Sequence, residues 1–179
     1  MKKEIEIKIL NIDPSKLKRM IKNLGGRQIL RSTLMRELYF ESPADNRAYS
    51  SFRLRSEGNK IFLTLKVKKE DKRFEIRDEY EVEVNNFDTM KNILELAGFK
   101  CFRRRGKKRE SYRLGNTRIE IDTYPGMNPY AEIESAKKRD IEKFMEMMGF
   151  SLAYATKKTA TEIIRDAGLD PDNLMFQKK

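Results

Sequence analysis

The strongest constraint in this sequence is a strict alternation of charged and apolar residues that recurs in segment after segment. Over residues 3–10, Glu4, Glu6 and Lys8 alternate with isoleucines. A period of two places the charged side chains on one face of a β-strand and the isoleucines on the other. Similar runs predict strands over residues 34–40, 51–55, 61–68, 75–84, 107–113, 117–123 and 132–134. The sequence therefore predicts about eight strands, most with one charged face.

Segments with helical spacing follow three of these strands. Each of the three strands carries a Glu-x-Glu pair, and each following segment ends at a glycine, namely Gly25, Gly98 or Gly149. Apolar residues every three or four positions predict amphipathic helices there. A short fourth helix is predicted over residues 161–167. The arrangement indicates internal pseudo-symmetry within one domain, residues 1–168, followed by a loose C-terminal tail over residues 169–179.

The composition excludes several kinds of chemistry. The chain has 179 residues, no histidine and a single cysteine, Cys101. Histidine catalysis, histidine-ligated zinc and an intramolecular disulfide are therefore excluded. We expect a cytoplasmic protein without a membrane span, because no apolar run approaches about 18 residues and the charged N-terminus lacks a signal peptide. Lys and Arg number 39 against 28 Asp and Glu, a net charge of +11, which indicates an anionic partner.

The charged strand faces carry their charges in pairs. A solvated surface explains one such strand, but several Glu-x-Glu and Arg-x-Arg pairs on an open sheet would repel one another. Two carboxylates at positions i and i+2 of a strand lie about 7 Å apart and could share Mg²⁺ or Mn²⁺. Pairs of Arg or Lys at the same spacing can bind successive phosphates. We therefore interpret the charged faces as a metal-assisted site for a phosphate chain, lining either an open sheet or a lumen.

The order of these segments also resembles a known family. The N-terminal motif is Glu4-Ile5-Glu6-Ile7-Lys8. Downstream follow Leu38-Tyr39-Phe40, Arg53-Leu54-Arg55, Leu63-Thr64-Leu65-Lys66, Arg77-Asp78-Glu79-Tyr80-Glu81, Ala97-Gly98-Phe99, Lys107-Lys108-Arg109-Glu110-Ser111-Tyr112, Ile121-Asp122 and Ala131-Glu132-Ile133-Glu134. Over roughly residues 2–165 the chain resembles the CYTH superfamily of class IV adenylate cyclases and thiamine triphosphatases. The resemblance implies an α+β fold, an eight-stranded antiparallel β-barrel (the triphosphate tunnel) with flanking helices.

The resemblance further implies roles for single residues. The metal-binding carboxylates would be Glu4, Glu6, Asp122, Glu132 and Glu134. The triphosphate-binding cations would be Lys8, Arg53, Arg55, Lys66, Arg77, Lys107, Arg109 and Lys158. Tyr39 and Lys66 resemble a pair that activates the attacking water in triphosphatase members, with the pKa of Lys66 lowered by neighbouring cations. Asn128 and Ala160 stand where the family usually has glycine and tyrosine.

The implied activity is that of a Mg²⁺- or Mn²⁺-dependent enzyme acting on ATP, tripolyphosphate or thiamine triphosphate. It would be either an adenylate cyclase, forming cyclic AMP and pyrophosphate, or a triphosphatase. The protein would be either a monomer or a homodimer. The other hypothesis is a non-catalytic module for RNA or polyphosphate. It rests on the dense basic run from Lys100 to Arg113. Within this run, Arg103–Arg105 are out of register with a purely inward role, which leaves an external anion patch open even beside catalysis.

Overall fold

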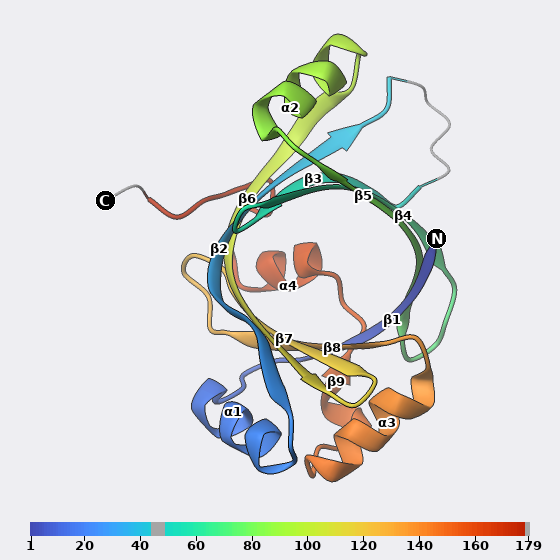
Figure 1. The fold of residues 1–179 in the computed structure, drawn as a ribbon, viewed down its shortest axis with the longest axis vertical. Helices are drawn as coiled ribbons and strands as arrows, with labels where there is room; N and C mark the ends of the chain where they lie inside the picture. Colours follow the sequence, from blue (N-terminus) through green and yellow to red (C-terminus); the bar gives the residue numbers. More distant parts are fainter. Residues whose placement is uncertain (44–48, 178–179) are drawn as a thin grey trace.

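The centre of the molecule is a closed ring of antiparallel strands. The computed structural model describes residues 1–43 and 49–177. Eight strands form the ring: β1 (Lys2–Ile9), β2 (Arg27–Glu41), β3 (Ser51–Glu57), β4 (Lys60–Lys69), β5 (Glu75–Val84), β6 (Lys100–Leu114), β7 (Thr117–Thr123) and β8 (Tyr130–Ser135). They neighbour one another in the order β6-β2-β3-β4-β5-β1-β8-β7, and β7 pairs back with β6 (Figure 1). The predicted eight-stranded antiparallel barrel is confirmed.

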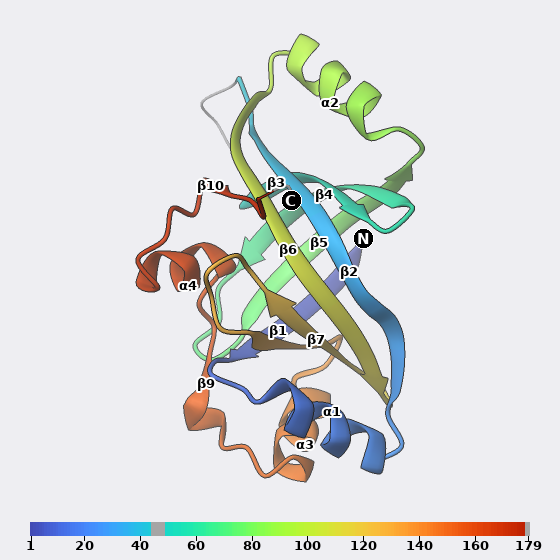
Figure 2. The same ribbon diagram turned by 90° about the vertical axis from the view of Figure 1, so that its left-hand side faces the viewer.

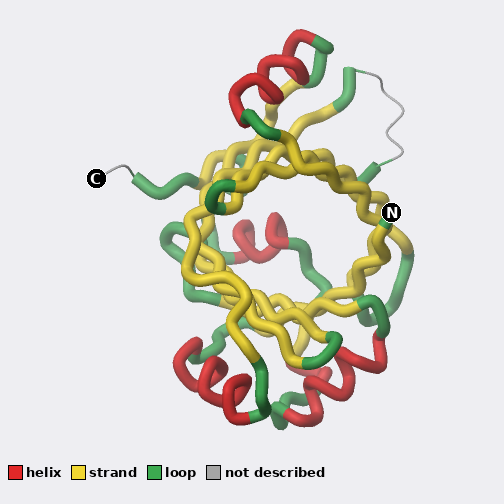
Figure 3. Tube along the Cα trace, viewed as in Figure 1, coloured by secondary structure: helices red, strands yellow, loops and turns green. Residues whose placement is uncertain are grey.

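The described residues form four α-helices, the number predicted, three of them outside the ring and one across its end. They are α1 (Pro14–Asn23), α2 (Phe87–Leu96), α3 (Lys138–Met147) and α4 (Ala160–Asp166), with a short 3₁₀ helix at Leu152–Tyr154. Helices α1 and α3 lie outside the wall formed by β1, β7 and β8, and α2 stands at the far side of the ring (Figure 3). The two ribbon views together show α4 across one end of the ring (Figure 2). One end of the barrel is therefore covered by this helix.

The two-faced strands explain why the ring forms. Their apolar residues point outward and pack beneath the helices, as Ile5 and Ile7 do against Leu17 of α1 and Ile141 of α3. The charged residues of the same strands must then point inward, and Glu4, Glu6 and Lys8 of β1 are almost fully buried. The sequence left an open sheet and an enclosed lumen as alternatives. In the structure the charged faces line a lumen.

The chain passes through the same order of elements twice. Strand, helix and three strands follow one another as β1-α1-β2-β3-β4 and again as β5-α2-β6-β7-β8. The helices of both halves end at a glycine with positive φ, 82° at Gly25 and 88° at Gly98, a left-handed conformation that side chains disfavour. The predicted strand–helix–glycine units are present, and β8, α3 and Gly149 make a third.

The structure differs from the sequence-based expectation mainly in β6 and in the C-terminal tail. The basic run from Lys100 lies wholly within β6 rather than partly in a loop. Two short strands were missed: β9 (Ala155–Thr156) pairs with β1, and β10 (Asn173–Leu174) pairs in parallel with β6. Because β7 pairs only with residues 108–114 of β6, the edge beside Arg104 and Arg105 is open to β10.

The expectation of a loose tail is therefore wrong at β10; residues 178–179 of the tail lie outside the described part of the chain. That residues 1–168 form the single domain stays a prediction. No helix in the described residues combines the length and apolar character that a membrane span requires.

Candidate functional site

The ring encloses a cavity of about 370 Å³, within the range of roughly 300–1,000 Å³ that is usual for small-molecule sites. Every strand of the ring contributes lining side chains, and Thr159, Ala160 and Thr161 contribute from the start of α4. The strand alternation explains this, because every second residue of a barrel strand points inward. The charged residues of distant sequence segments therefore meet in one lumen.

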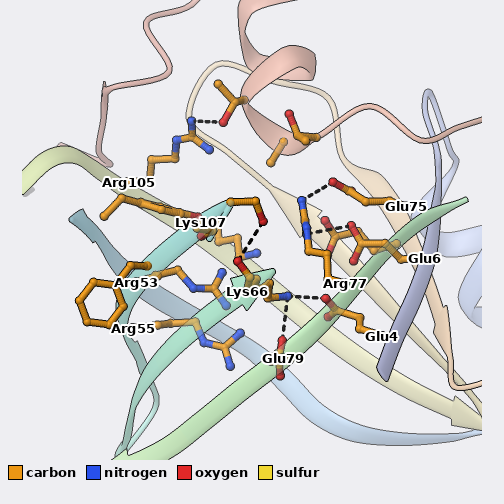
Figure 4. Close-up of a pocket in the computed structure, with 18 of the residues that line it drawn as sticks. Glu4, Glu6, Arg53, Arg55, Lys66, Glu75, Arg77, Glu79, Arg105 and Lys107 are labelled. Atoms are coloured by element: carbon orange, nitrogen blue, oxygen red, sulfur yellow. Dashed lines mark hydrogen bonds and ion pairs between the residues drawn. The ribbon is translucent and has the colours of Figure 1, made fainter. Parts of the chain in front are cut away.

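Charge is unevenly distributed around this lumen. One side, here called the cation arc, comprises seven lining cations on β3, β4 and β6: Arg53, Arg55, Lys66, Arg103, Arg105, Lys107 and Arg109. The other side, the acidic arc, lies on β1, β5, β7 and β8 and holds all eight carboxylates of the described lining: Glu4, Glu6, Glu75, Glu79, Glu81, Glu120, Glu132 and Glu134. Figure 4 shows labelled members of both arcs facing each other. The acidic arc also holds four lining cations, Lys2, Lys8, Arg77 and Arg118. The tunnel thus has one side lined by cations and another on which carboxylates outnumber cations.

The cation arc is held in place by buried ion pairs. Lys107 and Arg109 both donate to Asp122, with Nζ–Oδ2 and Nε–Oδ1 distances of 2.8 and 2.6 Å. Arg109 also pairs with Glu132 at 2.6 Å and with Glu120. Although burial opposes it, Asp122 and Glu120 raise the pKa of the Arg109 guanidinium well above its ordinary value. Arg109 therefore stays charged although it is buried.

The acidic arc carries more carboxylates than its cations neutralise. Burial raises the pKa of Glu4 to about 7, with the neighbouring carboxylates Glu6 and Glu134 adding to the rise and Lys66 opposing it. Burial, with Asp122 and Glu6, also raises the pKa of Glu132. On adjacent strands, Glu6 lies directly opposite Glu134 in the β1–β8 register. A bound cation would relieve this crowding of negative charge.

The predicted metal ligands nevertheless have protein partners in this structure. Glu4 accepts from Lys66 at 2.5 Å, Glu6 from Lys8 at 2.5 Å, and Glu134 from Lys2 at 2.6 Å. Among residues 1–43 and 49–177, no group of three acidic side chains is close enough to hold a metal. The donor chemistry of Glu4, Glu6, Glu132 and Glu134 fits a hard divalent ion, but binding would require these carboxylates to exchange partners.

Two predicted residues lie outside the lumen lining. Asp122 is fully buried behind the lumen as the partner of Lys107 and Arg109. Lys158 is exposed and pairs with Asp166 of α4 at 2.7 Å. The structure brings all the other predicted site residues together in the cavity lining: Glu4, Glu6, Lys8, Tyr39, Arg53, Arg55, Lys66, Arg77, Lys107, Arg109, Glu132 and Glu134.

Lys66 does not have the lowered pKa that the sequence interpretation gave it. Its Nζ lies 2.5 Å from Glu4 and 2.8 Å from Glu79. Burial opposes the charged form, but these two carboxylates prevail and raise the pKa of Lys66. The hydroxyl of Tyr39 instead donates to Glu37 at 3.2 Å. Lys66 is therefore a charged group suited to binding phosphate, and a poor proton acceptor.

The interpretation of Arg103–Arg105 as an external patch is also wrong. Arg103 and Arg105 share the inward register of Lys107 and Arg109 and line the cavity, whereas Arg104 is exposed. Arg105 donates to the carbonyl of Pro171 at 2.6 Å and to Thr161 at 2.8 Å. The basic run therefore divides by alternation, and its inward half belongs to the lumen.

Several buried residues of the site were missed. The fully buried Glu37 accepts from Arg53 at 3.0 Å, and Glu75 accepts from Lys8 at 2.8 Å. The available signal was spacing, because Glu37 stands two residues before Tyr39 and Glu75 two before Arg77, in the same strand register.

Comparisons with known proteins agree with this architecture. The sequence profile of the CYTH domain matches residues 2–158. A protein of Methanocaldococcus jannaschii named "Putative adenylate cyclase" is 29% identical over 153 residues, covering 81% of this chain and 87% of that protein.

Solved structures share the fold at low sequence identity. A "putative adenylate cyclase" of Vibrio parahaemolyticus superposes with a TM-score of 0.77 at 16% identity, covering 92% of this chain and 98% of the other. A Hippeastrum protein, described as a "putative adenylyl cyclase" that "reveals a dominant" triphosphatase activity, has a TM-score of 0.62 at 19% identity, covering 95% and 97%.

Proposed function

Since this chain belongs to the CYTH domain family, we propose that it is a divalent-metal-dependent enzyme whose tunnel binds the triphosphate group of a small molecule. The separation of charge in the lumen supports this most directly. A triphosphate carries about four negative charges, and burying such a group costs several kcal/mol per ion unless fixed cations neutralise it. The seven cations of the cation arc provide that neutralisation on one side of the lumen.

Glu4, Glu6, Glu132 and Glu134 are the residues that would hold Mg²⁺ or Mn²⁺. They supply the oxygen donors that such ions prefer. Burial, with a smaller contribution from neighbouring carboxylates, raises the pKa of Glu4 and of Glu132. When bound, the metal would polarise a phosphate oxygen. The residues of the cation arc would bind the phosphate chain and keep it aligned between the two sides.

Hydrolysis is the reaction that the lining supports best. Tyr39 lies in the cavity wall with its hydroxyl hydrogen-bonded at 3.2 Å to Glu37, where it can orient a water molecule. Attack by water on the terminal phosphorus would release orthophosphate. The Hippeastrum protein, whose description reports triphosphatase activity, shares this fold.

A second candidate reaction is cyclisation of ATP, in which the ribose 3′-hydroxyl attacks the α-phosphorus and pyrophosphate leaves. It is favoured by aromatic side chains in the lining, since Tyr49, Phe52 and Phe102 could contact a nucleobase. The names of the Methanocaldococcus and Vibrio relatives point the same way.

Phosphorus NMR of the protein with Mn²⁺ or Mg²⁺, supplied separately with tripolyphosphate and ATP, tests the proposal. Orthophosphate release identifies a triphosphatase, and cyclic AMP with pyrophosphate identifies a cyclase. Glu6→Gln should abolish metal-dependent turnover while the protein stays folded. Glu83→Gln is the matched control, because Glu83 lies on the exposed part of β5 and pairs with Lys60. Retained turnover in Glu6→Gln would contradict the metal assignment.

A further inference from the structure

Glu37 lies behind the cation arc with no exposed surface. It sits on β2 between two cationic strands, directly opposite Arg55 of β3 and Arg105 of β6 in the strand register. A carboxylate in such a place is retained only where strong partners offset the cost of removing it from water. Its partners therefore indicate its role.

One carboxylate joins three lining residues from three strands. Its Oε1 accepts a hydrogen bond from Arg53 Nη1 at 3.0 Å and lies 3.6 Å from Lys107 Nζ. Its Oε2 accepts a hydrogen bond from the Tyr39 hydroxyl at 3.2 Å. Burial alone would disfavour the ionised form, yet Lys107 and Arg53 hold the pKa of Glu37 well below its ordinary value. Glu37 is thus an ionised link between Tyr39, on β2, and two phosphate-facing cations.

We propose that Glu37 is the positioning residue of this tunnel, fixing the Tyr39 hydroxyl toward the reacting water while Arg53 and Lys107 keep the Glu37 carboxylate in place. Because the Tyr39 hydroxyl donates its hydrogen bond to Glu37, its oxygen lone pairs are left to accept a hydrogen bond from water. This inference rests on the proposed function. It adds a residue that acts through Tyr39 without touching the substrate.

The position of Glu37 has opposite consequences for binding and for turnover. A negative charge behind the cation arc weakens the attraction of the arc for phosphate, so a neutral residue there would not weaken substrate binding. A neutral residue at position 37 would also leave the Tyr39 hydroxyl without its ionised acceptor and remove one of the bonds that hold Arg53. Loss of Glu37 should therefore lower kcat without raising KM.

The test is Glu37→Gln, which keeps the size of the side chain and removes its charge. We expect kcat to fall at least about tenfold with KM unchanged or lower. The double variant with Tyr39→Phe should lose no more than the more damaging single variant, because the two residues act as one unit. Glu83→Gln, the same exchange at an exposed position, should change neither constant. An unchanged kcat, a raised KM, or losses that multiply in the double variant would overturn the proposal.

Two further measurements keep the test decisive. If Glu37→Gln does not fold, Glu37→Asp replaces it, and the shorter carboxylate should lower kcat with KM unchanged; full activity would overturn the proposal. If the wild-type protein converts neither tripolyphosphate nor ATP, the proposed function fails separately. Calorimetric titration with tripolyphosphate then decides on Glu37: equal or tighter binding by the folded variant is expected, and weaker binding contradicts its placement behind the cation arc.

Discussion

Single residues in this lumen are defined by the partners that they contact, and Lys66 shows this most clearly. It contacts Glu4 and Glu79 and stays charged, so we assign it to phosphate binding. Lys66→Arg should then keep kcat and KM within a few-fold of wild type, whereas Lys66→Gln should raise KM at least about tenfold. Steady-state kinetics with tripolyphosphate measures both. A proton-accepting lysine would give a different result, because arginine cannot give up its proton and Lys66→Arg would be inactive.

Two of the predicted metal ligands should differ sharply in their effect on stability. Asp122 is fully buried between Lys107 and Arg109, so Asp122→Asn leaves buried cations without their partner and should cost about 3–5 kcal/mol of unfolding free energy. Glu134 pairs with Lys2, whose side chain is 61% exposed, and Glu134→Gln should cost less than about 1 kcal/mol. Urea unfolding in EDTA measures both values without metal. Equal costs, or the reverse order, would contradict a structural role for Asp122.

The sequence could predict the inward residues wherever alternation was unbroken. Glu4, Glu6, Arg53 and Arg55 lie in the lumen as expected from their strand patterns. Ion-pair partners could not be predicted in this way, because they depend on which strands become neighbours around the ring. Glu37 illustrates the limit. The alternation of its own strand predicts which way its side chain points, but its contacts with β3 and β6 are long-range and could not be predicted.

At the scale of elements, the C-terminal segment acts as part of the barrel end. Arg103 donates to Asp172 at 2.6 Å and Arg105 to the Pro171 carbonyl at 2.6 Å, while β10 extends the edge of β6. The segment therefore connects the cation arc to α4, where Thr161 accepts from both arginines. A two-residue strand has no sequence pattern of its own, which is why it was expected to be loose.

Truncation after Leu169 tests the importance of this segment. It removes Asp172 and Pro171, which accept hydrogen bonds from Arg103 and Arg105. A lost hydrogen bond to a charged group costs about 1.5–3 kcal/mol. Two such bonds cost about 3–6 kcal/mol. Since each kcal/mol shifts the melting temperature by about 2–4 °C in a domain of this size, we expect a fall of at least about 6 °C. Asp172→Ala in the full chain, which affects Arg103 alone, should give a smaller fall. A truncated protein that melts with the wild type would support the original expectation of a loose tail.

For the whole molecule, the two faces of the strands left both an open sheet and a lumen possible, and the closed barrel was predicted by the resemblance that the order of the motifs carries. The apolar faces need cover from helices, and the charged faces then need an enclosed lumen with opposite charges in contact. The division of that lumen into two arcs was not predictable from any one segment. It depends on β2 lying between β6 and β3 while β1 lies between β5 and β8.

The central claim is that the cation arc is the phosphate-binding side of the tunnel. Calorimetric titration of tripolyphosphate in EDTA, on wild type, Arg55→Gln and Arg104→Gln, tests it most directly. Arg55 lines the lumen, whereas Arg104 is exposed on the outside of β6. We predict one binding site per chain, at least about tenfold weaker binding in Arg55→Gln, and wild-type binding in Arg104→Gln. Absent binding, or equal weakening in the two variants, would contradict the claim.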